Sequence, residues 1–281
     1  MFHNYTRQIP TVKKDYRPVS NSDSALSEAE FIERYWTRVW NNDKFSVSFT
    51  EEIEKREEFK VIGPYLSGLS SNGRILDGGC GLGEWTLYLA SKGIDVVGLD
   101  ISRATIRKLT EKFQRECFVV GDIRSTEFEN NHFDAYFSWG AFEHFEDGLG
   151  APLREARRIL KTGGYLFVSV PFQNCRHLLR DSRELWLWDE NYDKDRGYQS
   201  EIRFYQWRLT KAELKREFEI NGFRTLEIKA IGKEQGIRGA VKYDLHIEPD
   251  SRFGAIVQRL LRLLIPRDFV AHMIIGAAQK V

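Results

Sequence analysis

Cysteine, unbalanced charge and long apolar runs are all scarce in this sequence of 281 residues. Cys80, Cys117 and Cys175 are odd in number and widely spaced, which indicates neither a disulfide framework nor a metal cluster. Lys and Arg number 42 against 41 Asp and Glu, so the formal net charge is +1. That balance gives no electrostatic case for nucleic acid as the main partner.

Apolar runs long enough to cross a membrane are missing as well. The stretch 255–265 is interrupted by Arg259 and Arg262 and is shorter than the ~20 residues that a transmembrane helix needs. Three uses of this stretch stay open: packing against the domain's own sheet, which we favour, peripheral contact with a membrane, or a subunit interface. Residues 1–7 hold no apolar signal core, and together with the few cysteines this favours a cytoplasmic location.

Glycine, in contrast, is concentrated in one short segment. A brief apolar run ends in Asp77, and glycines follow at every second position, Gly79, Gly81 and Gly83, before the amphipathic residues 85–90. This pattern predicts a strand, a tight turn and the start of a helix, because a Cβ would block positive φ values or the approach of a ligand to the backbone. Such a turn offers N–H groups and a helix N-terminus to a negatively charged group.

The next apolar run, residues 95–100, predicts a neighbouring strand with Asp100 at its end. In doubly wound sheets ligands bind at the carboxyl ends of the strands, where a carboxylate can accept hydrogen bonds from both hydroxyls of a ribose. The turn and Asp100 together therefore predict a nucleoside site. The dinucleotide fingerprint of oxidoreductases is excluded, because it needs glycine where this chain has Glu84.

The segment Asp77-Gly78-Gly79-Cys80-Gly81-Leu82-Gly83 resembles the first motif of the class I methyltransferases that use S-adenosylmethionine. The similarity continues in order through Asp100, the segment 121–123, the run 133–138 and the stretch 153–171. One glycine loop is a weak signal, but five matches in register over roughly a hundred residues are a strong one.

This resemblance implies S-adenosyl-L-methionine as the cofactor and a role for each matching residue. Asp77 would face the amino group of the cofactor, Asp100 would hold the ribose, and Asp122 would hold the adenine amine or serve as a turn residue. The remaining cofactor contacts that it implies are Gly79, Cys80, Gly81 and Gly83 at the methionine part, Ile101 and Ile123 on the ring faces, Ser138 at the end of the fourth strand and Trp139 just after it. Asp134 opens its strand, so we expect a structural role for it.

The segment 139–145 follows the fourth strand, at the rim where members of this family meet their acceptors. His144 titrates near neutrality and is a candidate general base, or else a histidine that orients the loop. The hexapeptide Gly140–Phe145 also resembles cyclopropane fatty acid synthases, relatives whose matching glutamate holds bicarbonate. That resemblance makes Glu143 a candidate ligand holder and a lipid or carbon acceptor the rival of an oxygen acceptor.

The family pattern implies an α/β fold, a doubly wound, Rossmann-like, seven-stranded sheet with an antiparallel last strand beneath an N-terminal helical cover. We expect an arm and cover over 1–68 and the methyltransferase domain over 69–281, with insertions near 173–203 and 233–266. The expected strands are 74–77, 95–100, 117–121, 133–138, 165–171, 225–231 and 272–278, and the expected helices are 84–92, 103–115, 151–160 and 211–218. Glycines in 161–164 should end the third of these helices, and Thr210 should cap the fourth.

Ahead of the sheet, residues 1–26 are polar, contain Pro10 and Pro18 and show no periodicity, which favours an irregular arm. A capping box at 27–30 starts a helix whose aromatic stripe we interpret as packing surface, and a second helix is expected after Thr50. In the first insertion, Arg176–Tyr192 mixes aromatic rings with charged groups, as in many small-molecule pockets, and this suits a polyhydroxylated acceptor such as a sugar.

We therefore expect an S-adenosylmethionine-dependent methyltransferase that acts on a small molecule or a saccharide, with an oxygen acceptor favoured. A carbon or lipid methyltransferase and a catalytically silent protein that binds the cofactor are the alternatives. The sequence does not specify the acceptor or the oligomeric state.

Overall fold

The computed structural model describes residues 13–42, 50–68, 73–183, 192–193, 197–198 and 202–281. Its centre is a seven-stranded sheet in the order β10-β11-β6-β5-β2-β3-β4. The bounds of these strands are β2 Arg74–Gly78, β3 Asp95–Asp100, β4 Phe118–Val120, β5 Phe133–Trp139, β6 Leu160–Pro171, β10 Phe223–Ile231 and β11 Met273–Lys280. The expected α/β fold is confirmed.

Six strands of the sheet run in the same direction, and the last strand of the chain, β11, runs antiparallel to both of its neighbours, β10 and β6. The chain starts in the middle at β2, winds outward through β3 and β4, and then returns to the other side of β2 with β5. The winding therefore reverses between β2 and β5, which is where an open α/β sheet binds its ligand. The expected antiparallel last strand is confirmed.

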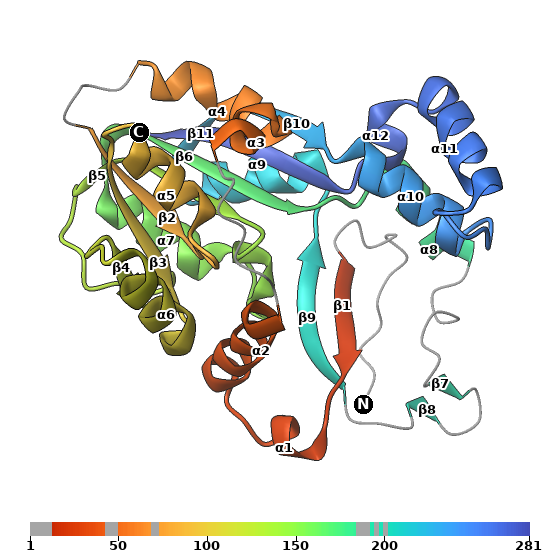
Figure 1. Ribbon diagram of the computed structural model, residues 1–281, viewed down its shortest axis with the longest axis horizontal. Helices are drawn as coiled ribbons and strands as arrows, with labels where there is room; N and C mark the ends of the chain where they lie inside the picture. Colours follow the sequence, from red (N-terminus) through yellow and green to blue (C-terminus); the bar gives the residue numbers. More distant parts are fainter. Residues whose placement is uncertain (1–12, 43–49, 69–72, 184–191, 194–196, 199–201) are drawn as a thin grey trace.

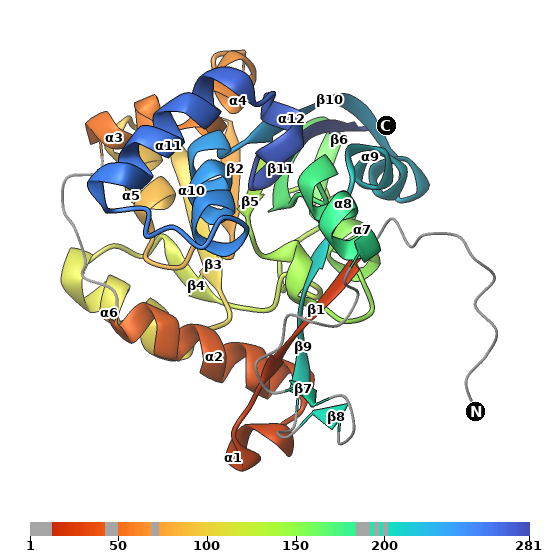
Figure 2. The ribbon, with the colours of Figure 1, turned by 90° about the vertical axis from the view of Figure 1, so that its right-hand side faces the viewer.

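Helices cover both faces of the sheet (Figure 2). Those of the first face are α3 Thr50–Lys55, α4 Glu57–Leu66 and α5 Glu84–Ser91, and those of the second face include α7 Gly150–Ile159 and α9 Lys211–Ile220. Successive strand residues point to opposite faces, so Ile75 packs under the first group whereas Leu76 packs under the second. Helix α6, Arg103–Phe113, buries Ile106 and Leu109 against Phe118 of β4.

The N-terminal arm is more regular than its composition predicts. Residues Lys13–Pro18 form strand β1, which pairs antiparallel with β9, Ile202–Arg208, and Asn21–Ser24 form the short helix α1. The expectation of an irregular arm is therefore wrong for these residues, while residues 1–12 lie outside the described part. The partner strand of β1 is nearly 200 positions away, so local periodicity could not reveal the pairing.

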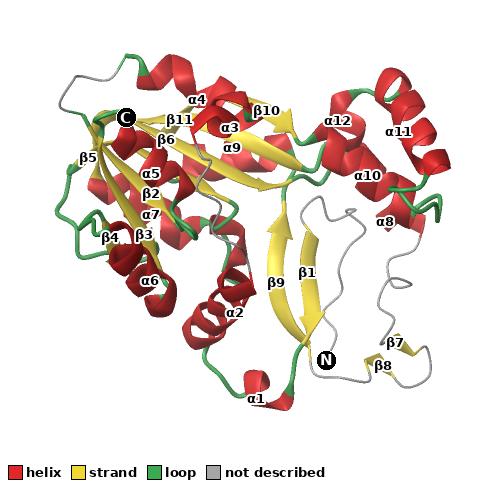
Figure 3. Ribbon diagram, viewed as in Figure 1, coloured by secondary structure: helices red, strands yellow, loops and turns green. Residues whose placement is uncertain are grey.

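Helix α2, Glu28–Asn42, begins at the expected capping box, in which Glu30 accepts hydrogen bonds from the backbone N–H and the hydroxyl of Ser27. Figure 3 shows α2 beside the β1–β9 ribbon. The helix expected after Thr50 is divided in two, because extended backbone at Arg56 separates α3 from α4.

Two predicted helix boundaries differ in outcome. Thr210 caps α9 in a capping box with Glu213, as expected. The prediction that glycine ends α7 is wrong, because Leu160 is already extended and β6 starts there. Gly163 does have a positive φ of 80°, but it lies inside the strand, where its carbonyl accepts a hydrogen bond from Gln279.

Asp134 accepts a hydrogen bond from the N–H of Arg74 and forms an ion pair with Lys161, which fits the structural role expected of it.

The two segments that we expect to be insertions add helices at one end of the sheet. The first begins with α8, Cys175–Arg183, and contains the short strands β7, Tyr192–Asp193, and β8, Gly197–Tyr198, whereas residues 184–191 lie outside the described part. The second holds α10, Lys233–Tyr243, and α11, Arg252–Leu264, and α12, Arg267–Val270, follows it. Among the described residues, none of the helices combines the length and hydrophobicity that a membrane crossing requires.

Candidate active site

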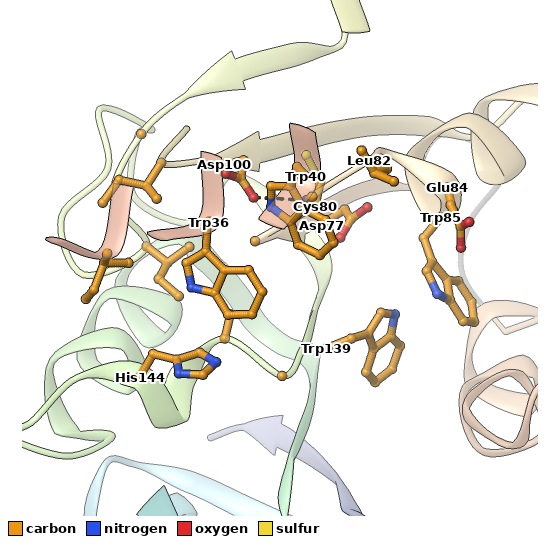
Figure 4. A pocket seen from close by; sticks show the side chains of 18 of the residues that line it. Trp36, Trp40, Asp77, Cys80, Leu82, Glu84, Trp85, Asp100, Trp139 and His144 are labelled. Atoms are coloured by element: carbon orange, nitrogen blue, oxygen red, sulfur yellow. Dashed lines mark hydrogen bonds between the residues drawn. The ribbon is translucent and has the colours of Figure 1, made fainter. Parts of the chain in front are cut away.

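One cavity of about 340 Å³ lies at the carboxyl ends of β2, β3 and β5, beneath helix α2. Its size falls within the range of small-molecule sites, which start at ~300 Å³. Most of the residues singled out in the sequence line it: Asp77, Gly79, Cys80, Gly81, Asp100, Ile101, Asp122, Ile123, Trp139 and His144. Figure 4 shows the aromatic rings of Trp36, Trp40, Trp85, Trp139 and His144 arranged around this cavity, with Asp77 and Asp100 on one side of it.

Asp77 is the buried residue next to the last of β2, and the Thr86 hydroxyl donates a 2.7 Å hydrogen bond to its carboxylate. Burial raises the pKa of Asp77 to about 7, since the hydrogen bonds from Thr86 do not replace the lost hydration of the charged form. A cationic group in the cavity would therefore be attracted by this carboxylate and would lower its pKa. The amino group of an amino-acid moiety is a cation of this kind.

Asp100 lies at the end of the adjacent strand and is also buried, which raises its pKa. Its two carboxylate oxygens accept hydrogen bonds from the backbone N–H groups of Gly81, at 2.9 Å, and Ser102, at 2.8 Å. These two bonds fix the plane of the carboxylate at the cavity wall and connect it directly to the glycine turn. Each oxygen keeps a lone pair for a further donor, so a diol such as a ribose edge is a suitable partner.

The glycine turn lies open to the cavity beneath the ring of Trp40. A Cβ placed on Gly81, whose φ is 51°, would lie 2.8 Å from a carbon of that ring, so glycine is needed at this position. Trp40 therefore covers the turn without filling it, because Gly79, Cys80 and Gly81 all border the cavity. The backbone N–H groups of Gly79 and Cys80 donate to the Leu99 carbonyl, which holds the turn against β3.

At the opposite end, Asp122 and Ile123 follow β4. Asp122 accepts hydrogen bonds from the backbone N–H and the guanidinium of Arg124, which also pairs with Glu28 of α2. Asp122 therefore acts as a turn residue and lines the cavity at the same time. Ile101 and Ile123 add apolar wall beside it, a surface suited to a flat heterocyclic ring.

His144 belongs to the short 3₁₀ helix η1, Phe142–His144, that follows β5. Its Nδ1 lies 2.6 Å from the carbonyl oxygen of Tyr205, which makes Nδ1 the donor and leaves a lone pair on Nε2. Burial lowers the pKa of His144 to about 4, so the expectation of a histidine that titrates near neutrality is wrong for this environment. The imidazole ring also packs edge-on against Trp36, at 4.9 Å between centroids.

Three residues predicted for the site do not line the cavity. Ser138 is fully buried and donates its hydroxyl hydrogen to the Gly78 carbonyl, because the pleat of β5 turns its side chain toward β2. Gly83 packs against Phe118, whose ring a Cβ at Gly83 would approach to 2.7 Å. Glu143 is also buried away from the cavity, and burial raises its pKa to about 8. Its Oε2 has no hydrogen-bond partner among the described residues.

Several cavity residues are missing from the sequence-based prediction. The interpretation of the aromatic stripe as packing surface is incomplete, because Trp36 packs against the core but the stacked rings of Trp36 and Trp40 also line the cavity. Helical spacing alone does not distinguish an apolar face over a core from one over a ligand site. Arg56 also lines the wall and forms a 2.6 Å ion pair with Glu84, so the break between α3 and α4 brings a guanidinium to the site.

The residues present fit S-adenosyl-L-methionine. The cavity offers a carboxylate for the amino group at Asp77, a guanidinium for the methionine carboxylate at Arg56, and a fixed carboxylate for the ribose at Asp100. The Nε1 atoms of Trp40 and Trp139 are buried without a hydrogen-bond partner in the described structure. Electron-rich ring faces around the centre of the cavity suit a sulfonium cation.

Comparison with known proteins agrees with this geometry. Residues 76–168 match the family described as "Methyltransferase domain". This part of the chain is a class I S-adenosylmethionine-dependent methyltransferase domain. The expected cofactor, S-adenosyl-L-methionine, is confirmed together with the family. The local similarity of Gly140–Phe145 to cyclopropane fatty acid synthases stays a prediction.

Two curated relatives of the methyltransferase differ in their acceptors. It is 33% identical over 97 residues to a malonyl-[acyl-carrier protein] O-methyltransferase of Erwinia pyrifoliae, an alignment that covers 34% of this chain and 37% of the relative. It is 29% identical over 147 residues to a sterol 24-C-methyltransferase of Kluyveromyces lactis, covering 48% and 38% of the two chains. The chain thus spans less than half the length of either relative.

A solved structure supports the fold over a larger part of the chain. Phosphoethanolamine N-methyltransferase 2 of Haemonchus contortus, in complex with S-adenosyl-L-methionine, superposes with a TM-score of 0.55 at 18% identity. The superposition covers 91% of this methyltransferase and 60% of that chain. At this identity the likeness shows the fold, while the names of the relatives cover oxygen, carbon and nitrogen acceptors.

Proposed function

We propose that this methyltransferase transfers a methyl group from S-adenosyl-L-methionine to a hydroxyl group of a small molecule, with His144 as the general base. The observation that carries the proposal is the position of His144 in the same cavity as Asp77 and Asp100. The Nδ1–H of His144 is bonded to the Tyr205 carbonyl, so Nε2 carries the lone pair that would receive a proton from an acceptor.

The bound cofactor supplies a methyl group on a sulfonium, which is already an electrophile. The protein therefore has to hold the acceptor in line and keep water out, contributions that reach ~7–11 kcal/mol in the best intramolecular cases. Trp36, Trp40 and Trp139 form apolar walls that exclude water around the centre of the cavity. His144 would receive the acceptor proton on Nε2 as the oxygen–methyl bond forms, while the Tyr205 carbonyl stabilises the resulting imidazolium through Nδ1–H.

The low pKa of His144 limits the kind of hydroxyl that it can deprotonate. With a pKa of about 4 the imidazole is neutral throughout the neutral range, but its affinity for a proton is small. Proton transfer from an aliphatic alcohol would therefore come late, when the oxygen already carries much of the new bond. More acidic acceptor hydroxyls suit this base better.

A saccharide is part of this proposal through the first insertion. The aromatic and charged residues that suggest a sugar acceptor lie largely in 184–191, outside the described residues. Tyr205 and Trp207 of β9 contact the loop after β5: Tyr205 through His144, and Trp207 through a 2.9 Å hydrogen bond to the Phe145 carbonyl.

One observation favours a carbon or lipid acceptor as a second candidate. Glu143 keeps an unpaired buried Oε2, a feature expected of a residue that holds a small ligand. Its carboxyl group does not border the cavity, however, so a ligand held by Glu143 would need space that the described residues do not provide.

The test is a mass-spectrometric screen of acceptors with cofactor labelled in its methyl group, repeated with His144→Ala. We expect label on an oxygen of a hydroxylated acceptor and a loss of turnover of ~100-fold or more in the variant. The affinity for the cofactor, measured by calorimetry, should change less than twofold, because His144 lies at the acceptor end.

Each alternative predicts a different result. Label on a carbon, with turnover abolished by Glu143→Gln and retained by His144→Ala, would replace the proposal with the carbon acceptor. Tight cofactor binding without label on any acceptor would indicate a catalytically silent protein. Undiminished turnover of an alcohol by His144→Ala would remove His144 from the role of base.

A further inference from the structure

Helix α11 has two apolar faces, and one of them points away from the protein. The inner face packs on α10 and α12 through Val257, Leu261 and Ile265. The outer face carries five large apolar side chains that are 53% to 78% exposed: Phe253, Ile256, Leu260, Leu263 and Leu264. Their spacing places them along one side of the helix. The other exposed large apolar side chains of the described residues are scattered over separate elements.

Arginine borders this exposed stripe, and acidic residues are missing from it. Between Ser251 and Arg267 the sequence has four arginines and neither Asp nor Glu. This segment therefore carries a charge of +4, whereas the whole chain carries +1, so the remainder is −3. Arg262 pairs with Glu234 and Arg267 with Glu57, but Arg252 and Arg259 make no ion pair within the described residues.

The position of α11 leaves its outer face open. Figures 1 and 2 show α11 at the outer edge of the molecule, with α10 between it and the sheet. The helix is fixed there by its inner face and by its cap, in which the Ser251 hydroxyl accepts a hydrogen bond from the Gly254 N–H. The N-terminal turn also lies close to the preceding backbone, because a Cβ on Gly254 would meet the Glu248 carbonyl oxygen. The stripe is thus held on a rigid support.

We propose that the outer face of α11 binds an anionic lipid surface, with the helix lying parallel to that surface. A helix with one apolar face and arginines beside it has the features of interfacial helices, whose apolar side chains enter the boundary between headgroups and acyl chains. The unpaired Arg252 and Arg259 would then meet negatively charged headgroups, an attraction that salt screens.

A second copy of this chain is a poorer occupant of the same face. A symmetric dimer places the same patch on both sides of the interface. It would bring Arg252 and Arg259 of each copy close to their counterparts, and the segment 251–267 contains no acidic residue to offset them. The charge pattern therefore favours a negatively charged partner.

The test is sedimentation of the full chain with two kinds of vesicle, phosphatidylcholine alone and phosphatidylcholine mixed with phosphatidylserine at roughly three to one. We expect binding to the anionic vesicles that weakens as salt is raised, and little binding to the neutral ones. The double substitutions Leu260→Asp with Leu263→Asp, and Arg252→Gln with Arg259→Gln, should each reduce the partition coefficient by at least ~tenfold.

Ile220→Asp is the matched control, because Ile220 is equally apolar and 65% exposed but lies on α9. It should bind the vesicles as the unmodified protein does, and unchanged cofactor affinity in all variants would show that they are folded. The proposal is overturned if the unmodified protein fails to bind anionic vesicles at low salt, or if the two double variants bind as well as Ile220→Asp. Concentration-dependent dimers that disappear in Leu260→Asp with Leu263→Asp, without vesicle binding, would assign the face to a second copy.

Discussion

The substitution Glu143→Gln should stabilise this protein, and increasingly so as the pH rises. Burial without a partner for Oε2 raises the pKa of Glu143 from 4.5 to about 8, so the folded protein keeps this carboxyl protonated at neutral pH. The unfolded chain ionises near 4.5. Below about pH 4.5 the carboxyl is neutral in both states and does not reduce the free energy of unfolding. As the pH rises from there through about 8, ionisation in the unfolded chain lowers the free energy of unfolding.

The magnitude follows from these two pKa values at ~1.4 kcal/mol for each pH unit between them. Glutamine has the same shape as glutamic acid and no charge. The free energy of unfolding of the Glu143→Gln variant should therefore exceed that of the unmodified protein by ~1 kcal/mol at pH 5.5 and by ~5 kcal/mol at pH 8.5. Urea unfolding followed by tryptophan fluorescence at four pH values between these limits would measure the difference.

A control with the opposite sign is available in the same protein. Glu155 is nearly buried as well, but hydrogen bonds from Arg158 and Thr126 lower its pKa. Glu155→Gln should therefore destabilise the protein at neutral pH, with a difference that shrinks as the pH falls through the pKa of Glu155. If Glu143→Gln and the unmodified protein lose stability in parallel from pH 5.5 to 8.5, the carboxyl of Glu143 is not held neutral by burial, and the reasoning fails.

Three further predictions concern the cofactor and the fold. Affinity for S-adenosyl-L-methionine should fall by up to ~tenfold per pH unit below about pH 7, where Asp77 becomes protonated, and Asp77→Asn should abolish this dependence in calorimetry. Asp100→Ala should weaken cofactor binding by ~1.5–3 kcal/mol or more, since hydrogen bonds to a buried charged group are lost; unchanged affinity would contradict its role at the ribose. Thr210→Ala should lower the free energy of unfolding by ~1 kcal/mol, because it removes the capping box of α9. A change in cofactor affinity would contradict a purely structural role for Thr210.

The parallel part of the sheet could be predicted because each strand carries its own local signal. The runs that end in Asp77 and Asp100 are short, apolar and followed by turn residues, and the structure places their strands side by side. The pairing of β1 with β9 has no such signal, since the two strands are brought together only by the finished fold. The same reason applies to Arg56, which reaches the cavity at the break between α3 and α4, a break that the sequence does not predict.

The position of a residue at a strand end predicts less well whether its side chain lines the cavity. Asp77 and Ser138 both lie at the switch point, but the pleat directs Asp77 to the cavity and Ser138 to the Gly78 carbonyl. The glycines differ in the same way: Gly81 makes room beneath Trp40 at the cavity, whereas Gly83 makes room for Phe118 of β4. A motif of this family thus combines residues that border the cofactor with residues that shape the turn.

This division has a consequence for mutational tests of the glycine turn. A side chain at Gly83 would push on Phe118 from a backbone with a φ of 71°, and its effect on the cofactor would come through a displaced turn. Gly83→Ala should therefore reduce stability and cofactor affinity together. Asp100→Ala removes only groups at the cavity wall and should reduce affinity far more than the free energy of unfolding. A loss of activity in a glycine variant would not distinguish a displaced turn from a lost contact with the cofactor. Substitutions of the carboxylates therefore test the cofactor site more directly.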